Sequence, residues 1–146
     1  MKKLWPLLFL LACNNPKEEA QVNTFEQDKD SISKLMNKQQ AAWNDGNLGE
    51  FMAPYLNNEN LMFVGKSGLN KGWQTTLDNY KRAYPTSEKM GTLLFENKEF
   101  ESLGNEHFLV IGKWNLFRTS DTLRGYYSLV WKKDQEGWKI IADHSS

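Results

Sequence analysis

The sequence predicts an α+β domain in which helices cover one face of a curved antiparallel sheet. Two observations support this class. Up to residue 85, apolar side chains recur at helical spacing in three segments, whereas the rest of the chain holds four extended segments with polar turns between them. Helices followed by a meander of strands are typical of α+β domains, because strands joined by short turns pair antiparallel. The 146 residues, of which 40% are hydrophobic, are enough for one such domain.

Three helices are expected before the main sheet. The first starts with a capping box at residues 24–27 and ends at Gly46. Asn47 can cap a short second helix. In the third, residues 73–84 place four large side chains on one face, and Pro85 ends the helix. One strand is expected at residues 61–64, and the meander at residues 92–101, 107–118, 124–133 and 138–144.

The first twelve residues have the charged, apolar and small-residue zones of a secretory signal. The apolar run at residues 4–12 is far shorter than the ~20 residues of a membrane-spanning helix, and Pro6 interrupts it. The sequence Leu10-Leu11-Ala12-Cys13 resembles the lipobox of bacterial lipoproteins, in which the cysteine is lipidated. The sequence therefore predicts a signal peptide at residues 1–12 and attachment to a membrane through a lipid on Cys13.

The expected location is the bacterial cell envelope, at the outer membrane or the cell surface, with the leaflet left open. Asn14 follows the cysteine in place of the aspartate of inner-membrane retention, and residues 17–19 resemble an acidic surface-export tag. Residues 13–23 are polar without an apolar period, so they are expected to form the lipidated cysteine and a flexible tether to a domain at residues 24–146. Because Cys13 is the only cysteine, the fold cannot contain an internal disulfide.

The composition argues against several classes of partner. The chain has 18 basic and 18 acidic residues; without Lys2 and Lys3 the balance is 16 to 18, so no nucleic-acid partner is expected. The two histidines, His107 and His144, fall on different predicted strands and Cys13 is expected to carry lipid, so no metal site is expected. Neither a G-x-S-x-G elbow nor a glycine-rich phosphate loop occurs, and no cofactor is expected.

Pairing the strands through the turns at residues 119–122 and 134–137 predicts which side chains share a face. Trp114 falls opposite Tyr127, and Tyr127 opposite His144. This face is interpreted as the concave wall of a pocket, and its other members are Gly112, Leu116, Leu129, Trp131, Ile140 and Ala142. The outer face is expected to carry Ile111, Phe117, Tyr126, Val130 and Ile141. A slip of one residue would exchange the two faces.

Short motifs along the chain are similar to those of a known family. They are Trp43-Asn44-Asp45-Gly46-Asn47-Leu48, Phe63-Val64-Gly65, Gly72-Trp73, Tyr84-Pro85, Met90-Gly91-Thr92-Leu93, Gly112-Lys113-Trp114, Gly137-Trp138-Lys139-Ile140 and Asp143-His144. Together they resemble the DUF4440 branch, also called SnoaL-like, of the nuclear transport factor 2-like (NTF2-like) superfamily. The resemblance implies a cone of three N-terminal helices packed on a strongly curved antiparallel sheet, with an apolar pocket inside. Members include isomerases, cyclases, dehydratases, hydrolases and binding or dimerising domains, so the fold alone assigns no function.

Ketosteroid isomerases of this superfamily use a carboxylate base and two donors that hold an oxyanion. By the resemblance, the base falls near Phe63 or Val64, and the donors fall near Gln39 and Tyr127. Neither Phe63 nor Val64 is acidic, so this chemistry is not expected.

Seven aromatic or polar residues are candidates for ligand binding: Trp43, Tyr55, Tyr80, Trp114, Tyr127, Trp131 and His144. The aromatic residues of the helices would equally fill a core, because helical spacing alone explains their positions. His144 and Tyr127 are the catalytic candidates, since a histidine titrates near neutrality. Alternatively, His144 is hydrogen-bonded at the end of its strand without a catalytic role. Its neighbour Asp143 is expected on the opposite face.

These expectations describe a cell-envelope lipoprotein whose domain binds a small, mostly apolar molecule without turnover. Two alternatives stay open. One is a small-molecule isomerase, dehydratase or hydrolase that uses His144 and Tyr127, and the other is a dimerising protein-interaction module that uses the outer face of the sheet. A homodimer is expected in each case, because the apolar residues of the outer face need a cover.

Overall fold

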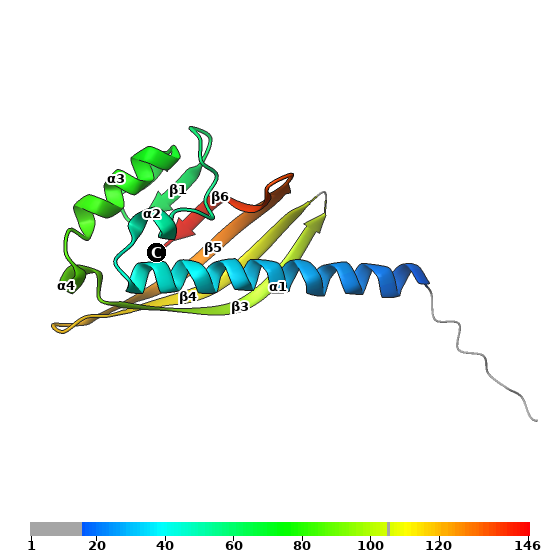
Figure 1. The fold of residues 1–146 in the computed structure, drawn as a ribbon, viewed down its shortest axis with the longest axis horizontal. Helices are drawn as coiled ribbons and strands as arrows, with labels where there is room; N and C mark the ends of the chain where they lie inside the picture. Colours follow the sequence, from blue (N-terminus) through cyan, green and yellow to red (C-terminus); the bar gives the residue numbers. More distant parts are fainter. Residues whose placement is uncertain (1–15, 105) are drawn as a thin grey trace, which may run out of the picture.

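A computed structural model of the protein describes residues 16–104 and 106–146. The helices lie on one side of a curved sheet, and the long first helix runs along it (Figure 1). In chain order the elements are α1 Pro16–Asn44, α2 Leu48–Phe51, β1 Met62–Gly65, β2 Gly68–Lys71, α3 Trp73–Ala83, α4 Ser87–Met90, β3 Thr92–Gly104, β4 His107–Phe117, β5 Thr122–Asp134 and β6 Gly137–Ser145. The predicted α+β class is confirmed.

The sheet has six strands in the order β2-β1-β6-β5-β4-β3. The last four strands form the expected antiparallel meander, and β1 pairs with β6 in parallel. The first and last strands of the chain are therefore neighbours. Residues of β1 and β6 at the same level, such as Phe63 and Asp143, lie side by side on one face.

The prediction of three helices is wrong, because the described residues form four, and β2 was not predicted. The fourth helix, α4, is a single turn whose N-cap Thr86 accepts a hydrogen bond from the Lys89 backbone amide. In β2, Leu69 is the only apolar side chain and it is exposed, so the strand has no hydrophobic alternation. Both elements depend on backbone hydrogen bonds and capping rather than on burial, and apolar periodicity does not reveal such elements.

The helix α1 begins at Pro16, eight residues before the predicted start of the domain, and so extends through most of the expected tether. Proline is favoured at the first helical position, because its fixed backbone angle suits a helix and its missing N–H is not needed there. Cys13 and the predicted signal peptide lie outside the described residues. No helix of the described part is long and apolar enough to cross a membrane.

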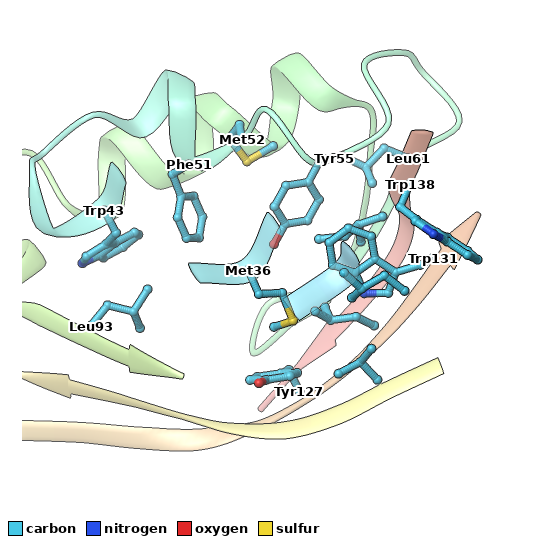
Figure 2. Close-up of a cluster of buried hydrophobic side chains, with 14 of the residues drawn as sticks. Met36, Trp43, Phe51, Met52, Tyr55, Leu61, Leu93, Tyr127, Trp131 and Trp138 are labelled. Carbon is cyan, nitrogen blue, oxygen red and sulfur yellow. The ribbon is translucent and has the colours of Figure 1, made fainter. Parts of the chain in front are cut away.

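The core fills the end of the domain near the β5–β6 turn. From α1, Ile32 and Met36 face the sheet, where Phe108, Trp131 and Ile140 are almost inaccessible to solvent. Figure 2 shows Trp131 and Trp138 at this end, with Met36 and Leu61 beside them. This packing closes one end of the space between helices and sheet and leaves the cavity at the other.

The open edge of the sheet at β3 is covered by side chains of α1. The Asn44 amide nitrogen donates to the Leu93 carbonyl at 3.1 Å, and the Leu93 amide donates to Asn44 Oδ1 at 2.7 Å. The Phe95 amide donates to Gln40 Oε1 at 2.6 Å. These bonds satisfy backbone groups that an edge strand otherwise leaves unpaired, and they hold α1 beside the sheet.

Candidate functional site

A cavity of about 1190 Å³ lies between the helices and the concave face of the sheet. Its interior is mainly aromatic and aliphatic. Side chains from both layers face one another there, with Trp43 and Phe51 on the helical side and Leu93 and Tyr127 on the sheet side (Figure 2). The aromatic and larger aliphatic lining residues are Trp43, Phe51, Tyr55, Phe63, Tyr80, Tyr84, Leu93, Phe95, Trp114, Leu116, Leu123, Tyr127 and Leu129.

The pairing of β4 with β5 differs from the predicted one by two residues. Tyr127 lies opposite Gly112, and Trp114 lies opposite Gly125. Because side chains alternate with a period of two, this shift leaves each of them on its predicted face. Trp114 and Tyr127 both line the cavity.

The predicted pairing of β5 with β6 is wrong for the residues that matter most. A β-bulge lies between the pairs Val130↔Ala142 and Trp131↔Ile140, so β6 has one extra residue there. Beyond it, His144 pairs with Ser128 on the outer face and is exposed. The interpretation of His144 as a pocket residue is therefore wrong, as is the placement of Ala142 on the concave face.

The bulge turns Asp143 into the cavity instead. Its side chain is 4% exposed and lies deep in the lining. Tyr55 Oη donates a hydrogen bond to Asp143 Oδ2 at 2.7 Å, and Ser145 Oγ donates to Oδ1 at 2.6 Å. Each carboxylate oxygen thus has one hydroxyl partner inside an otherwise apolar wall.

Burial raises the pKa of Asp143 to about 6, since a charged carboxylate loses the solvation that water would give it. The hydrogen bonds from Ser145 and Tyr55, and the charge of His144, act in the opposite direction and lower it. At neutral pH this side chain is mainly ionised, and it takes up a proton just below neutrality. Sequence analysis expected His144 in the pocket and Asp143 on the outer face. In the structure the two residues have exchanged faces.

Tyrosines surround this carboxyl group. Burial, and next the negative charge of Asp143, raise the pKa of Tyr55, Tyr80 and Tyr127. All three are therefore neutral hydroxyl groups at physiological pH, able to donate hydrogen bonds. The Tyr55 oxygen points from the helical layer toward the sheet (Figure 2).

Tyr127 lies across the neighbouring strand. Its hydroxyl donates to Asn97 Oδ1 on β3 at 2.6 Å, and its ring passes over Gly112 of β4 to reach it. A ring can lie so close to β4 only because Gly112 has no side chain. Tyr127 thus lines the cavity, and Asn97 holds its hydroxyl in place.

The remaining predicted site residues fall into two groups. Trp43, Tyr55 and Tyr80 line the cavity, as do Trp114 and Tyr127. Trp131 does not, because it is fully buried in the core beside Ile140, where its Nε1 has no hydrogen-bond partner in the described part of the chain. The aromatic side chains of the helices also pack on one another, so they serve both the wall of the cavity and the core.

Gln39, which the resemblance placed near an oxyanion donor, lies on α1 at 2% exposure and lines the cavity. Its Oε1 is buried and has no hydrogen-bond partner among the described residues. A buried polar atom without a partner costs free energy, so an amide at this place is suited to a polar group from outside the chain. Sequence analysis did not propose Gln39 as a binding residue.

Within residues 16–104 and 106–146, no group of three or more His, Cys, Asp and Glu side chains converges. The charged side chains that line the cavity are Asp143, which is buried, and three exposed cations, Lys66, Arg82 and Arg124.

These features define a class: a cone-like α+β domain whose helices and curved sheet enclose a deep, mainly apolar cavity with few polar groups. The family follows from comparison with a solved structure. An NTF2-like protein of unknown function from Shewanella oneidensis MR-1 is 40% identical, over 81% of this chain and 98% of that one, with a TM-score of 0.77. The chain belongs to the NTF2-like superfamily.

More distant structures share the fold alone. A domain of unknown function with a cystatin-like fold from Nostoc punctiforme PCC 73102 is 21% identical over 82% of this chain and 76% of that one, with a TM-score of 0.70. An NTF2-like protein of unknown function from Pseudomonas putida KT2440 is 15% identical over 80% and 84%, with a TM-score of 0.64. No protein-family model and no curated protein matches the sequence.

Proposed function

We propose that this protein is a cell-envelope lipoprotein that binds a small, mostly apolar molecule in its cavity without converting it. The cavity carries this proposal. Its volume of about 1190 Å³ is slightly above the ~300–1,000 Å³ of common ligand pockets, and its wall is mainly apolar. A core that only stabilised the fold would be packed to the density of an organic crystal and would leave no such space.

The cavity offers a ligand polar groups as well as an apolar wall. Asp143 accepts hydrogen bonds when ionised and donates one when protonated, and Gln39 adds an unpartnered carbonyl oxygen in the same cavity. Polar groups placed singly within an apolar wall fix the orientation of a ligand more than they add affinity.

The proposed location depends on the first residues of the chain. Leu10-Leu11-Ala12-Cys13 has the form of a lipobox, so we assign residues 1–12 to a signal peptide and Cys13 to lipidation, within the DUF4440 (SnoaL-like) branch of the superfamily. A homodimer is part of the proposal, supported by the exposure of Ile111, Phe117 and Tyr126 on the outer face of the sheet.

The first test is native mass spectrometry of the mature protein, purified in mild detergent from the envelope of its own cells. We expect a non-covalent mass excess that is lost on heating. Ala83 is exposed, ends α3 and lines the cavity, so Ala83→Trp should narrow the cavity and reduce the excess. Ala41→Trp, on an exposed position of α1 outside the lining, is the matched control and should retain it. A bare wild-type protein would contradict the proposal.

A second candidate function is supported by the position of Asp143. The resemblance to ketosteroid isomerases places the catalytic carboxylate near Phe63 or Val64 on β1, and Asp143 lies directly beside Phe63 on the neighbouring strand. A carboxyl group whose pKa is about 6 suits general acid–base catalysis near neutrality. The alternative is therefore an isomerase-type or dehydratase-type enzyme in which Asp143, and not His144, moves the proton.

Deuterium exchange separates binding from proton transfer. The molecule released by heating is returned to the protein in D₂O, and deuterium at its carbon atoms is measured with time. Simple binding predicts no exchange. If Asp143 takes a proton from carbon and returns a deuteron, exchange is expected with the wild type and should be about 100-fold slower or more with Asp143→Asn.

A further inference from the structure

We propose that the ligand is an anionic amphiphile, with its apolar body in the cavity and its acidic headgroup at the mouth beside Lys66, Arg82 and Arg124. This inference rests on the proposed binding function and names the chemical class of the ligand. It follows from the charge distribution of the cavity, which differs sharply between its depth and its mouth.

The three cations come from three separate parts of the fold. Lys66 lies in the turn between β1 and β2, Arg82 in the last turn of α3, and Arg124 near the start of β5. All three line the cavity, and all three are exposed, so each lies where the cavity meets solvent. Segments that are distant in sequence thus bring positive charge to the solvent-facing rim of one cavity.

These charges have no acidic partner within the part of the chain that the structure describes. Five ion pairs form there, and none includes Lys66, Arg82 or Arg124. Arg82 donates only to the neutral side chain of Asn79. By contrast, the nearby Arg118 is held by Asp121 through two hydrogen bonds of 2.6 Å. The cations of the mouth therefore remain available to an anion.

No exposed acidic side chain lines the cavity to offset them. Asp143 is the only acidic side chain among the lining residues, and it is buried at depth and bonded to Tyr55 and Ser145. The rest of the wall is mainly apolar, with side chains such as Trp114 and Leu123. A low-dielectric cleft rimmed by one sign of charge raises the local concentration of ligands of the opposite sign.

The geometry selects the orientation of such a ligand. An apolar chain gains free energy by leaving water for the cavity, whereas an acid group keeps its hydration and its counter-charges only at the mouth. A ligand with a basic group would bind the other way round, with the amine at Asp143. The two orientations predict opposite preferences for headgroup charge.

The test compares three probes of equal chain length on the mature full chain: decanoate, decanol and decylamine, titrated calorimetrically at neutral pH in low salt. We expect decanoate to bind about tenfold more tightly than decanol, because exposed ion pairs contribute only a few-fold each. Added salt should reduce this difference, since it screens exposed charges. Decylamine should bind most weakly.

Charge-removal variants identify the groups responsible. Arg82→Gln/Arg124→Gln should lower the affinity for decanoate several-fold, toward that for decanol, and change decanol binding much less. The matched control, Lys38→Gln/Lys132→Gln, removes the same charge from exposed positions outside the cavity and should change neither. A control that weakens decanoate binding equally would overturn the assignment to the mouth, because net charge would then explain the effect.

The outcomes keep this inference separate from the function on which it rests. If none of the three probes binds, the proposed binding function fails. If decanol and decanoate bind equally, the cavity takes apolar ligands but the anionic class is wrong. If decylamine binds most tightly, the polar end of the ligand is basic and lies at Asp143.

Discussion

Asp143→Asn is expected to remove a pH dependence from the stability of the folded protein. The pKa of Asp143 is about 6 in the folded state against 3.8 without burial. The folded state therefore holds the proton more tightly, and its free energy of unfolding falls as the pH rises from about 4 to about 6, then stays level. A difference of about two pKa units corresponds to roughly 3 kcal/mol, as an upper estimate.

The measurement is urea unfolding of the wild type and the variant at about pH 4 and about pH 7.5, on either side of the transition. The difference in unfolding free energy between the two proteins should shift by up to roughly 3 kcal/mol in favour of the variant at the higher pH. The hydrogen bonds from Tyr55 and Ser145 to the ionised carboxylate are already included in the pKa of Asp143, and the pH-independent part of the substitution cancels between the two pH values. A difference that does not change with pH would mean that Asp143 is solvated in the folded protein.

An exposed acid provides a control of opposite sign. Hydrogen bonding to Arg118 lowers the pKa of Asp121, so its contribution to stability is present above the pKa of the unfolded chain and is lost as the pH falls. Asp121→Asn should therefore become less stable relative to the wild type as the pH rises, and only slightly, because solvent screens this pair. If the stability of the two variants relative to the wild type changes with pH in opposite directions, the effect of Asp143→Asn comes from the burial of Asp143.

The coarse architecture could be predicted because burial leaves a periodic signal. Ile32, Met36 and Trp43 recur at helical spacing and face the sheet, and the four meander strands have apolar runs between polar turns. The strand β2 and the helix α4 leave no such signal. Hydrogen bonds to β1 and the Thr86 cap define them, so they become visible only when the chain is folded.

The site could be predicted only where the expected pairing of β6 with β5 is correct. Counting back from the β5–β6 turn gives the correct partner for Ile140 and the wrong one for every residue after it. The backbone of Ile140 is also bonded outside the meander, since its amide donates to the Pro54 carbonyl and its carbonyl accepts from the Leu56 amide. The bulge lies beside this contact between distant segments, which no local pattern of β6 reveals.

One consequence is that the aromatic wall was predictable and the polar group inside it was not. Trp43, Tyr55 and Tyr80 follow from helical spacing, whereas Asp143 and His144 exchange faces through a single inserted residue. Counting from the turn at residues 134–137 with unbroken alternation placed the histidine on the pocket face and the carboxylate on the other face. Sites on strands near a bulge are for this reason the least predictable from alternation.

Gly112→Ala is expected to destabilise the protein by about 3 kcal/mol through the floor of the cavity. A Cβ at this position would overlap the Tyr127 hydroxyl and ring carbon, and would lie 2.7 Å from the Glu96 carbonyl oxygen. Overpacking of this kind costs about 1–3 kcal/mol, and displacing the ring also breaks the Tyr127–Asn97 hydrogen bond, worth about 1 kcal/mol. Urea unfolding of the variant and the wild type measures the difference.

Two controls show whether the ring is the cause. In a Tyr127→Ala background the added methyl meets no ring, so the effect of Gly112→Ala should shrink by about 1 kcal/mol or more. Gly49→Ala, in α2, meets only Asn47 Oδ1 at 3.5 Å and should leave stability unchanged or raise it by up to about 1 kcal/mol. Equal effects of Gly112→Ala in both backgrounds would instead place the strain in the backbone contact with Glu96. Coupling between the two positions would mean that Tyr127 can cross β4 and form the floor of the cavity only because residue 112 has no side chain.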